Sequence, residues 1–387
     1  MTPSSRRRRT VLLSAVTALA LVAVAAPVGA VSDRARIPVL RFAGEATLPA
    51  GLPFEGTVAG GLSSLSYDAT RDVYYALSDA QPNLGQGPLR FYTLRINTSD
   101  GALGAGDVTV LDVTTLTDPL GAPLAPGTVD PEGLTLTDRD TLVITSEGFA
   151  TPATATTPAN VVPPFVREFG LDGRQLRDID LPAYVDPVLG TKGVRNNLGL
   201  ESAALTPNGR FLFTGFENAL VQDGPASTLA TGSPSRLLRI DAVTGALQRE
   251  YVYPNDPVAE PPLPAGQFTV NGLVELLPLN ARFLLSMERS FSVGAGNTVR
   301  IHRVALAGAT DVSGVADLDD AGTVRPVGKR LVVDLDTLGL TLDNLEGMTL
   351  GPRLPDGGRA LILMSDNNFA AGQVSQFLLF SARRIGP

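Results

Sequence analysis

One pattern recurs five times along this chain of 387 residues, and it restricts the possible folds more than any other feature. Each copy opens with a short, mainly apolar segment: GGLSSLSYD from Gly60, EGLTLTD from Glu132, ESAALTP from Glu201, NGLVELLPL from Asn271 and EGMTLGP from Glu346. Successive copies begin 72, 69, 70 and 75 residues apart. This nearly constant spacing indicates a fold built from repeated structural units.

Each copy continues with a second apolar segment, and all five of these end on a carboxylate. They are VYYALSD ending at Asp79, TLVITSE at Glu147, RFLFTGFE at Glu217, RFLLSME at Glu288 and ALILMSD at Asp366. A third alternating segment follows in every copy, and a fourth follows in four of them. Four such segments per repeat predict four antiparallel strands, which is one blade of a β-propeller.

The last repeat has no fourth segment after Ala382, whereas IPVLRFAG at 37–44 precedes the first repeat and has no partner there. We therefore predict an all-β propeller of five blades, closed by this N-terminal strand on the last blade. Because a blade usually needs only 40 to 50 residues, the long insertions would also accommodate a sixth. Two insertions rich in Ala, Thr, Pro and Ser, 150–163 and 218–234, are predicted to be flexible surface loops.

The N-terminal thirty residues have the features of a secretory signal peptide. Four arginines at 6–9 precede an apolar run from Val11 to about Ala26, and small residues at 28–30 suit a signal peptidase. The segment Arg8-Arg9-Thr10-Val11-Leu12 also resembles a twin-arginine export signal. We therefore expect a signal peptide at 1–30 and one secreted propeller domain at 31–387, with no membrane span in the mature chain.

Composition excludes several chemistries. The chain has no cysteine, so it offers no thiolate nucleophile, zinc–thiolate site or disulfide framework. His302 is the only histidine, which excludes two-histidine phosphatase chemistry, and we interpret it as a structural or surface residue. Loss of residues 1–30 removes four arginines and no acid, so the net charge changes from −8 to −12. An acidic chain of this kind favours cations and is a poor candidate for nucleic-acid binding.

The propeller geometry predicts where the repeated acids lie. The first strand of a blade lines the central channel and the second runs antiparallel beside it, so the start of one and the end of the other share a face. We expect these residues to form a ring of carboxylates at one mouth: Glu132, Glu201, Glu346 and Asn271 at the starts, and Asp79, Glu147, Glu217, Glu288 and Asp366 at the ends.

Clustered carboxylates repel one another unless a cation compensates. Ca²⁺ is the expected cofactor in an extracellular setting, because it accepts six to eight oxygen ligands in flexible geometry. The eight acids Asp79, Glu132, Glu147, Glu201, Glu217, Glu288, Glu346 and Asp366 are the candidate metal ligands. Neutral oxygens would come from Asn218, Asn271, Asn367 and Asn368. The alternative is that the acids only cap hairpins.

Several of these segments resemble a known family. DPEGLTL, NLGLESAALTPNGRFLFTGFEN, VNGLVELL…RFLLSMERSF and NLEGMTL…LILMSDNNF are similar to the "esterase-like activity of phytase" family of secreted bacterial proteins, and the similarity spans roughly 37–383. The positions that match its suspected active groups are Glu132, Glu201, Glu346 and Asp366. The first and fourth repeats depart from the pattern, with Gly60 and Asn271 in place of the glutamate.

The resemblance implies a calcium-dependent hydrolase of phosphate esters that uses no covalent intermediate. Glu132, Glu201, Glu346 and Arg289 are the candidate catalytic residues, with Arg195 and Arg289 as the candidates for contacting phosphate. Calcium-dependent propeller phytases surround phosphate with lysine and arginine as well as calcium, whereas this chain has only two lysines. The alternatives are a non-catalytic propeller that binds a ligand or cell-wall polymer, a phosphodiesterase, or a carboxyl esterase. In each enzymatic case the partner is a small-molecule ester, and the protein is expected to be a monomer.

Overall fold

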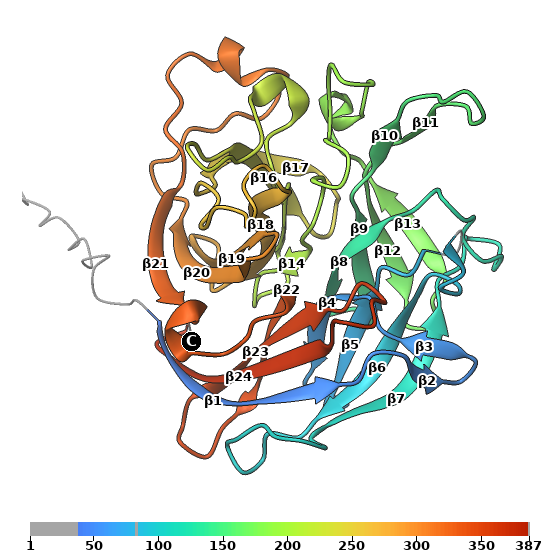
Figure 1. Ribbon diagram of the computed structural model, residues 1–387, viewed down its shortest axis with the longest axis vertical. Coiled ribbons are helices and arrows are strands. Elements are labelled where there is room, and N and C mark those ends of the chain that lie inside the picture. Colours follow the sequence, from blue (N-terminus) through green and yellow to red (C-terminus); the bar gives the residue numbers. More distant parts are fainter. Residues whose placement is uncertain (1–37, 82–83, 386–387) are drawn as a thin grey trace, which may run out of the picture. The chain divides into compact units, whose positions relative to one another are not determined.

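The computed structural model describes residues 38–81 and 84–385. In these ranges the regular elements are β-strands and a few short 3₁₀ helices, as the alternating sequence pattern predicts. Five four-stranded antiparallel sheets are arranged in a ring, which is a five-bladed β-propeller (Figure 1). The predicted fold is therefore confirmed, and the described residues contain no sixth blade.

Four blades are each formed by one continuous stretch of chain, with the strands in sequence order from the axis outwards. Blade 1 contains β4 (Leu62–Asp68), β5 (Val73–Ser78), β6 (Arg90–Ile96) and β7 (Val108–Thr115). Blade 2 contains β8 (Pro131–Leu136), β9 (Thr141–Ser146), β12 (Phe165–Gly170) and β13 (Gln175–Ile179). Blade 3 contains β14 (Ala204–Leu205), β15 (Phe211–Gly215), β16 (Pro234–Asp241) and β17 (Leu247–Pro254). Blade 4 contains β18 (Thr269–Pro278), β19 (Phe283–Ser292), β20 (Gly296–Ala305) and β21 (Gly328–Asp334).

Blade 5 joins the two ends of the described chain. It contains β22 (Asn344–Arg353), β23 (Arg359–Asp366), β24 (Ser375–Arg383) and β1 (Val39–Leu48). The antiparallel pairing of β1 with β24 runs from Val39 opposite Arg383 to Leu48 opposite Ser375. In Figure 1 the blue β1 lies along the red β24. The predicted closure by an N-terminal strand is confirmed, although Ile37 lies outside the described residues.

The hydrophobic core is divided among the interfaces between blades. Five apolar clusters are present, and each contains residues from two neighbouring blades, including the pair of blades 1 and 5. In that cluster Tyr74 and Leu94 pack with Met364 and Phe377. The inner strands β4, β8, β14, β18 and β22 also contact one another around the axis. In a chain without cysteine, this burial is the main favourable contribution to stability.

The remaining elements lie in the connections. They are the hairpins β2 (Leu52–Phe54) with β3 (Thr57–Ala59) and β10 (Phe149–Thr151) with β11 (Asn160–Val162), and the 3₁₀ helices η3 (Ala183–Val185), η4 (Val221–Asp223), η5 (Leu318–Ala321) and η6 (Leu335–Leu338).

The two predicted surface loops differ from each other. Residues 151–160 are all exposed, as predicted for the insertion at 150–163. The insertion at 218–234 is partly buried, because Ala219 and Leu220 are in the core and Asp223 pairs with the buried Arg236, so that prediction is wrong for its first half. The predicted signal peptide lies outside the described residues. Within the described ranges, no helix is long and apolar enough to cross a membrane.

Candidate metal and active site at the acidic mouth

A repeated irregularity between the two inner strands of each blade directs acidic side chains to one mouth of the channel. The pairing shifts at a β-bulge between Pro131 and Leu134 in blade 2 and between Leu345 and Gly347 in blade 5. Glu132 and Glu346 are in these bulges. Glu201 has the corresponding place in blade 3, directly after Leu200, which pairs with Phe216. A bulge turns a side chain away from its regular direction, so all three glutamates face the axis.

The acids at the ends of the second strands are fixed by an equivalent backbone link. The amide nitrogen of Asp79 donates to the carbonyl of Gly61 at 2.8 Å, and that of Glu147 donates to the carbonyl of Asp130 at 2.9 Å. The amide nitrogen of Glu217 donates to the carbonyl of Gly199 at 2.7 Å. In blade 5, Asp366 pairs with Asn344 in the same position. These four acids are therefore structural equivalents, as their places in the repeat predicted.

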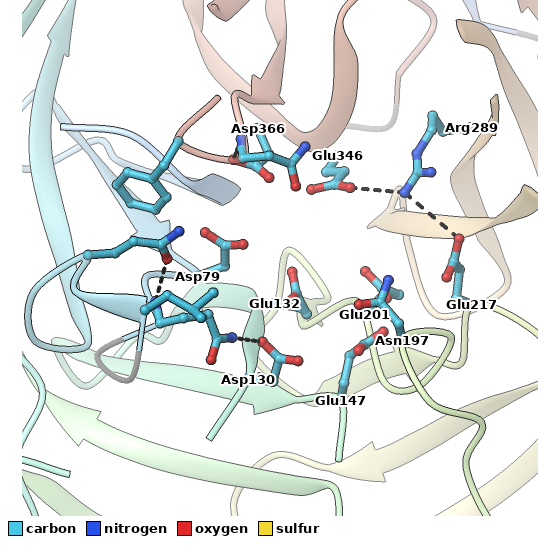
Figure 2. A pocket seen from close by; sticks show the side chains of 15 residues that line it. Asp79, Asp130, Glu132, Glu147, Asn197, Glu201, Glu217, Arg289, Glu346 and Asp366 are labelled. Carbon is cyan, nitrogen blue, oxygen red and sulfur yellow. Dashed lines mark hydrogen bonds and ion pairs between the residues drawn. The ribbon is translucent and has the colours of Figure 1, made fainter. Parts of the chain in front are cut away.

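Together these residues line a cavity of about 390 Å³ at the mouth of the channel (Figure 2). We call this cavity the acid pocket. Its acidic residues are Asp79, Asp130, Glu132, Glu147, Glu201, Glu217, Glu346 and Asp366. Seven of them were predicted from the repeats. Asp130 was not, although it stands two residues before Glu132 in the motif DPEGLTL, and that proximity was the available signal.

Blade 4 does not contribute an acid to this pocket, which corrects the predicted ring. Glu288 pairs with Leu273 and the bulge falls at Val274, so Arg289 occupies the position that an acid has in the other blades. Successive strand residues point to opposite sides of the sheet, and Arg289 therefore enters the acid pocket while Glu288 does not. By the same register Val274, rather than Asn271, corresponds to Glu132.

Blade 1 requires a similar correction. Its bulge lies between Leu62 and Ser64, so Ser63 corresponds to Glu132, whereas Gly60 had been aligned there. The two blades without a glutamate at the bulge are therefore blades 1 and 4. The carboxylates at the mouth form an incomplete ring, and the guanidinium of Arg289 takes the place of an acid in blade 4.

Glu288 belongs to a separate, internally neutralised cluster between blades 3 and 4. Its Oε1 accepts hydrogen bonds from Lys329 Nζ and from the Tyr253 hydroxyl, both at 2.6 Å. Lys329 Nζ also donates to Asp256 Oδ1 at 2.7 Å, and His302 Nε2 lies 3.5 Å from Asp256 Oδ2. Hydrogen bonds from His302 and then Lys329 lower the pKa of Asp256. Although Asp256, Glu288 and His302 lie close enough to hold a metal, the lysine already supplies the compensating charge.

Of the predicted asparagine ligands and Arg195, all except Asn368 have structural roles away from the acid pocket. Asn218 Nδ2 donates to the carbonyl of Asn271, and Asn367 Oδ1 accepts from the amide of Gly61. Arg195 donates to the carbonyls of Ala219 and Gly224 and does not line the acid pocket. Of the four predicted asparagines only Asn368 is at the mouth.

Burial and mutual repulsion make the acids of the pocket hard to ionise. Burial, reinforced by neighbouring carboxylates, raises the pKa of Glu147 to about 8 and that of Asp366 to about 8. Burial raises the pKa of Glu217 to about 7. The pKa values of Glu132 and Glu201 are raised well above the ordinary value for the same reasons. In the absence of a cation, several of these groups therefore hold protons near neutral pH.

Hydrogen bonding satisfies only part of this cluster. Asp366 Oδ1 accepts from the amide of Asn368 at 2.8 Å and Glu147 Oε1 accepts from the amide of Gly199 at 3.0 Å, so these two acids also cap backbone, as the alternative interpretation proposed. In contrast, Asp79 Oδ1 and Glu217 Oε1 are buried and accept no hydrogen bond. Capping alone does not account for them.

Arg289 lies across the cavity from Asp130 and Glu147 (Figure 2). Its Nη2 donates to Glu346 Oε1 at 3.0 Å and lies 3.8 Å from Glu217 Oε1. Burial of the guanidinium opposes its charge, but the negative charges of Glu346 and Glu217 outweigh this and raise its pKa. Its Nε is buried and has no hydrogen-bond partner, which leaves one donor free.

Two groups of acids have the spacing of a metal site, and they share one residue. In each group, ligand oxygens of Asp130, Glu132 and Glu147, or of Glu147, Glu201 and Glu217, all lie within 4.8 Å of one another. An oxygen-only donor set of this kind suits a hard cation such as Ca²⁺ or Mg²⁺. Glu217, whose Oε1 accepts no hydrogen bond, belongs to the second group, so the residues present fit a cation.

Two glycines allow this close approach. A Cβ at Gly133 would lie 2.4 Å from the amide nitrogen of Ala203, so the residue after Glu132 must be glycine for the backbones to pack this closely near the axis. A Cβ at Gly272 would lie 2.2 Å from Glu217 Cγ, so any larger residue would displace this acid from the pocket.

The chain is similar to one known protein family and to several solved structures. A family model described as "Phytase-like: Esterase-like activity of phytase" matches residues 57–369. Similar solved structures include a Dyadobacter fermentans protein of unknown function, with 13% identity, 85% of this chain and 80% of that chain covered, and a TM-score of 0.39. A putative oxidoreductase (glucose dehydrogenase) of Thermus thermophilus has 14% identity, 88% and 99% coverage and a TM-score of 0.35.

A tail fiber of a Staphylococcus aureus phage has 12% identity over 89% of this chain and 53% of that chain, with a TM-score of 0.38. Among curated proteins the search found no significant match.

Proposed function

Because the chain belongs to this phytase-like family, we propose that it is a hydrolase that acts on phosphate esters at the acid pocket with Ca²⁺ as its cofactor. The observation that carries the proposal is the pair of acidic groups joined by Glu147, with Arg289 on the opposite side of the same cavity. A phosphate ester needs compensation for its negative charge on more than one oxygen, and two adjacent cation sites with a guanidinium would supply it.

The acids named above would hold the ions, with Glu147 between them. When bound, Ca²⁺ would neutralise the carboxylates and polarise a phosphoryl oxygen as a Lewis acid. Without such ions, a phosphate group would face eight acids and one arginine in the acid pocket. The proposed binding of a phosphate ester therefore requires that Ca²⁺ first neutralise part of the negative charge of these acids.

The chain's own residues would orient the ester and accept a proton. Arg289 would donate its free Nε–H to a phosphate oxygen while Glu346 and Glu217 hold the guanidinium in place. Glu132 is half-buried and faces the cavity, so it would orient the attacking water. Glu201, which lines the same cavity, would in its deprotonated form accept the proton of that water and pass it to the alcohol oxygen as the P–O bond breaks.

We also propose that the protein is exported by the signal at residues 1–30 and acts outside the cell as a monomer. The predicted net charge of −12 after removal of the signal argues against nucleic acid as a partner. A carboxyl esterase and a non-catalytic binding propeller remain as the two alternative outcomes of the experiment below.

The test is a hydrolysis screen of phosphomonoesters, phosphodiesters and carboxyl esters by the mature protein, in Ca²⁺ and after chelation. The combined variant Glu132→Gln, Glu201→Gln and Glu346→Gln keeps the side-chain shapes and removes three charges. Glu260→Gln, an exposed acid outside the acid pocket, is the matched control. We expect Ca²⁺-dependent hydrolysis of phosphate esters, a loss of about 100-fold or more in the triple variant and no change in the control.

Full activity in a folded triple variant would locate the chemistry elsewhere. Hydrolysis of carboxyl esters alone would favour the esterase, and no hydrolysis of any ester by the unmodified protein would favour the binding propeller.

A further inference from the structure

We propose that a second compartment beside the acid pocket binds an aromatic or apolar group of the substrate, so that the preferred substrates are phosphate monoesters of such groups and not densely phosphorylated molecules. This inference rests on the proposed function and specifies its substrate class. It is drawn from the walls of the cavity that adjoins the acid pocket, which we call the aromatic compartment.

The aromatic compartment has a volume of about 500 Å³ and adjoins the acid pocket. Five residues line both cavities: Asn197, Glu217, Arg289, Glu346 and Asn368. Arg289 is therefore at the boundary, with one cavity on each side. A ligand whose phosphate contacts Arg289 would extend its remaining part into the aromatic compartment.

Two phenylalanines form the apolar wall of this compartment. Phe268 is 64% exposed, and its ring centroid lies 6.3 Å from that of the half-buried Phe291 at an interplanar angle of 40°. Val270 and Leu198 extend the apolar surface. Aromatic rings at this separation and tilt can receive another ring by edge or offset contact. Phe268 and Phe291 line the cavity, so a ligand in the compartment would contact them.

Amide side chains form the other walls and would accept polar substituents on the bound group. Asn297 Oδ1 is buried and has no hydrogen-bond partner, while its Nδ2 donates to the carbonyl of Leu342 at 3.3 Å. Gln373 and Asn344 also line the compartment. The free acceptor on Asn297 would receive a hydroxyl or amine hydrogen of the ligand.

The charge of the two cavities argues against a ligand with many phosphates. Among the described residues that line them, Arg289 is the only basic one, and Asp343 adds another acid on the aromatic side. The two lysines of the chain line neither cavity. A second or third phosphate placed in the aromatic compartment would meet carboxylate and phenyl groups, whereas an uncharged ring would bury apolar surface there.

The test compares benzyl phosphate with methyl phosphate, because both have alkyl leaving groups and differ mainly in the ring. Rates are measured for the unmodified protein, Phe268→Ala and Phe291→Ala. Val243→Ala, an exposed apolar residue outside both cavities, is the control. Phe268→Ala should raise KM for benzyl phosphate about fivefold to tenfold and leave methyl phosphate unchanged. Equal effects on the two esters, or no effect on either, would overturn the inference.

Binding of benzylphosphonate and methylphosphonate, which cannot be hydrolysed, separates this inference from the proposed function. If the protein hydrolyses no ester but binds benzylphosphonate more tightly than methylphosphonate, and Phe268→Ala abolishes the difference, the aromatic compartment is supported and the hydrolase proposal fails. If hydrolysis occurs but Phe268→Ala changes neither KM nor binding, the hydrolase proposal survives and the aromatic compartment does not.

Discussion

At the scale of single residues, Glu147 is the acid that links the two candidate cation sites of the acid pocket. It belongs to both groups of acids with metal-site spacing, and its carboxylate accepts from the amide of Gly199. Glu288 provides the contrast within the same repeat family, because it ends a corresponding segment of sequence but is neutralised by Lys329 inside blade 4. Substitutions of Glu147 and Glu288 should therefore have different effects, one on activity and the other on stability.

We expect Glu147→Gln to lower phosphate-ester hydrolysis about 100-fold or more, since it removes charge from both cation sites. The same change should not destabilise the metal-free protein, because a carboxylate that repels its neighbours is replaced by a neutral side chain of the same shape. Initial rates and thermal unfolding with a chelator measure the two effects.

Glu288→Gln should behave in the opposite way. It removes the charge of one of the two carboxylates that pair with the largely buried Lys329, so the free energy of unfolding should fall by about 1–3 kcal/mol while the activity per folded molecule stays near that of the unmodified protein. A large loss of activity with unchanged stability would mean that Glu288 acts at the mouth after all.

The raised pKa values give a pH dependence with a definite sign. Burial raises the pKa of Glu147 and Asp366 to about 8 and that of Glu217 to about 7, above their values in the unfolded chain. The folded state then holds protons that the unfolded state releases, so the stabilising contribution of these groups is complete at low pH and is lost as pH rises from about 4.5 to about 8.

We therefore expect the melting temperature of the chelated protein to fall between about pH 5 and pH 8, and the stabilisation by Ca²⁺ to grow over the same interval because the ions bind the deprotonated acids. Thermal unfolding with Ca²⁺ and with chelator across this range is the measurement. A difference between the two curves that shrinks with rising pH would contradict the assignment of these acids as ligands.

At the scale of elements, the repeat predicted the blades and their closure but not the register within blade 4. In blades 2 and 5 a glycine follows the acid of the first strand, which marks the bulge. In blade 4 the segment NGLVELLPL is almost continuously apolar, so alternation does not show that the bulge falls at Val274. The adjacent charges Glu288 and Arg289 then exchange faces when the register shifts by one residue.

Contacts between residues that are far apart in the sequence could not be predicted from local sequence patterns either. Lys329 is 41 residues from Glu288 and meets it only because β21 folds back along blade 4. Phe268 and Phe291 belong to neighbouring strand ends and give no motif. Local pattern predicts which strands form, whereas the partner of a buried charge depends on the packing of outer strands.

Removal of β1 tests the closure of the ring. A chain that begins at Ala50 lacks the strand that pairs with β24 from Arg383 to Ser375, and the freed edge of blade 5 would expose its backbone groups. We expect a large drop in melting temperature and aggregation on heating. Deletion of the exposed residues 152–159 is the control and should change the melting temperature little. Unchanged melting without β1 would show that the ring does not need it.

At the scale of the whole molecule, five similar blades produce a mouth that is not five-fold symmetric. Blades 2, 3 and 5 each present a glutamate at the bulge position, blade 1 presents Ser63, and blade 4 presents Val274 and contributes Arg289 at the strand end. The two groups of acids with metal-site spacing belong to blades 2 and 3 and the segments that precede their first strands, whereas Phe268 and Phe291 of the aromatic compartment belong to blade 4 or directly precede it. The repeated blades place equivalent positions around the mouth, and the differences in sequence at these positions make one side acidic and the other side basic and aromatic.

Calorimetric titration of the protein with Ca²⁺, compared with the Glu147→Gln variant, tests the central claim most directly. We predict two bound ions per molecule, fewer in the variant, and at a hundredfold excess over Kd a stabilisation of about 2.7 kcal/mol per site, seen as a higher melting temperature. No heat of binding, with the same melting temperature in Ca²⁺ and in chelator, would contradict the claim that the acid pocket is a cation site.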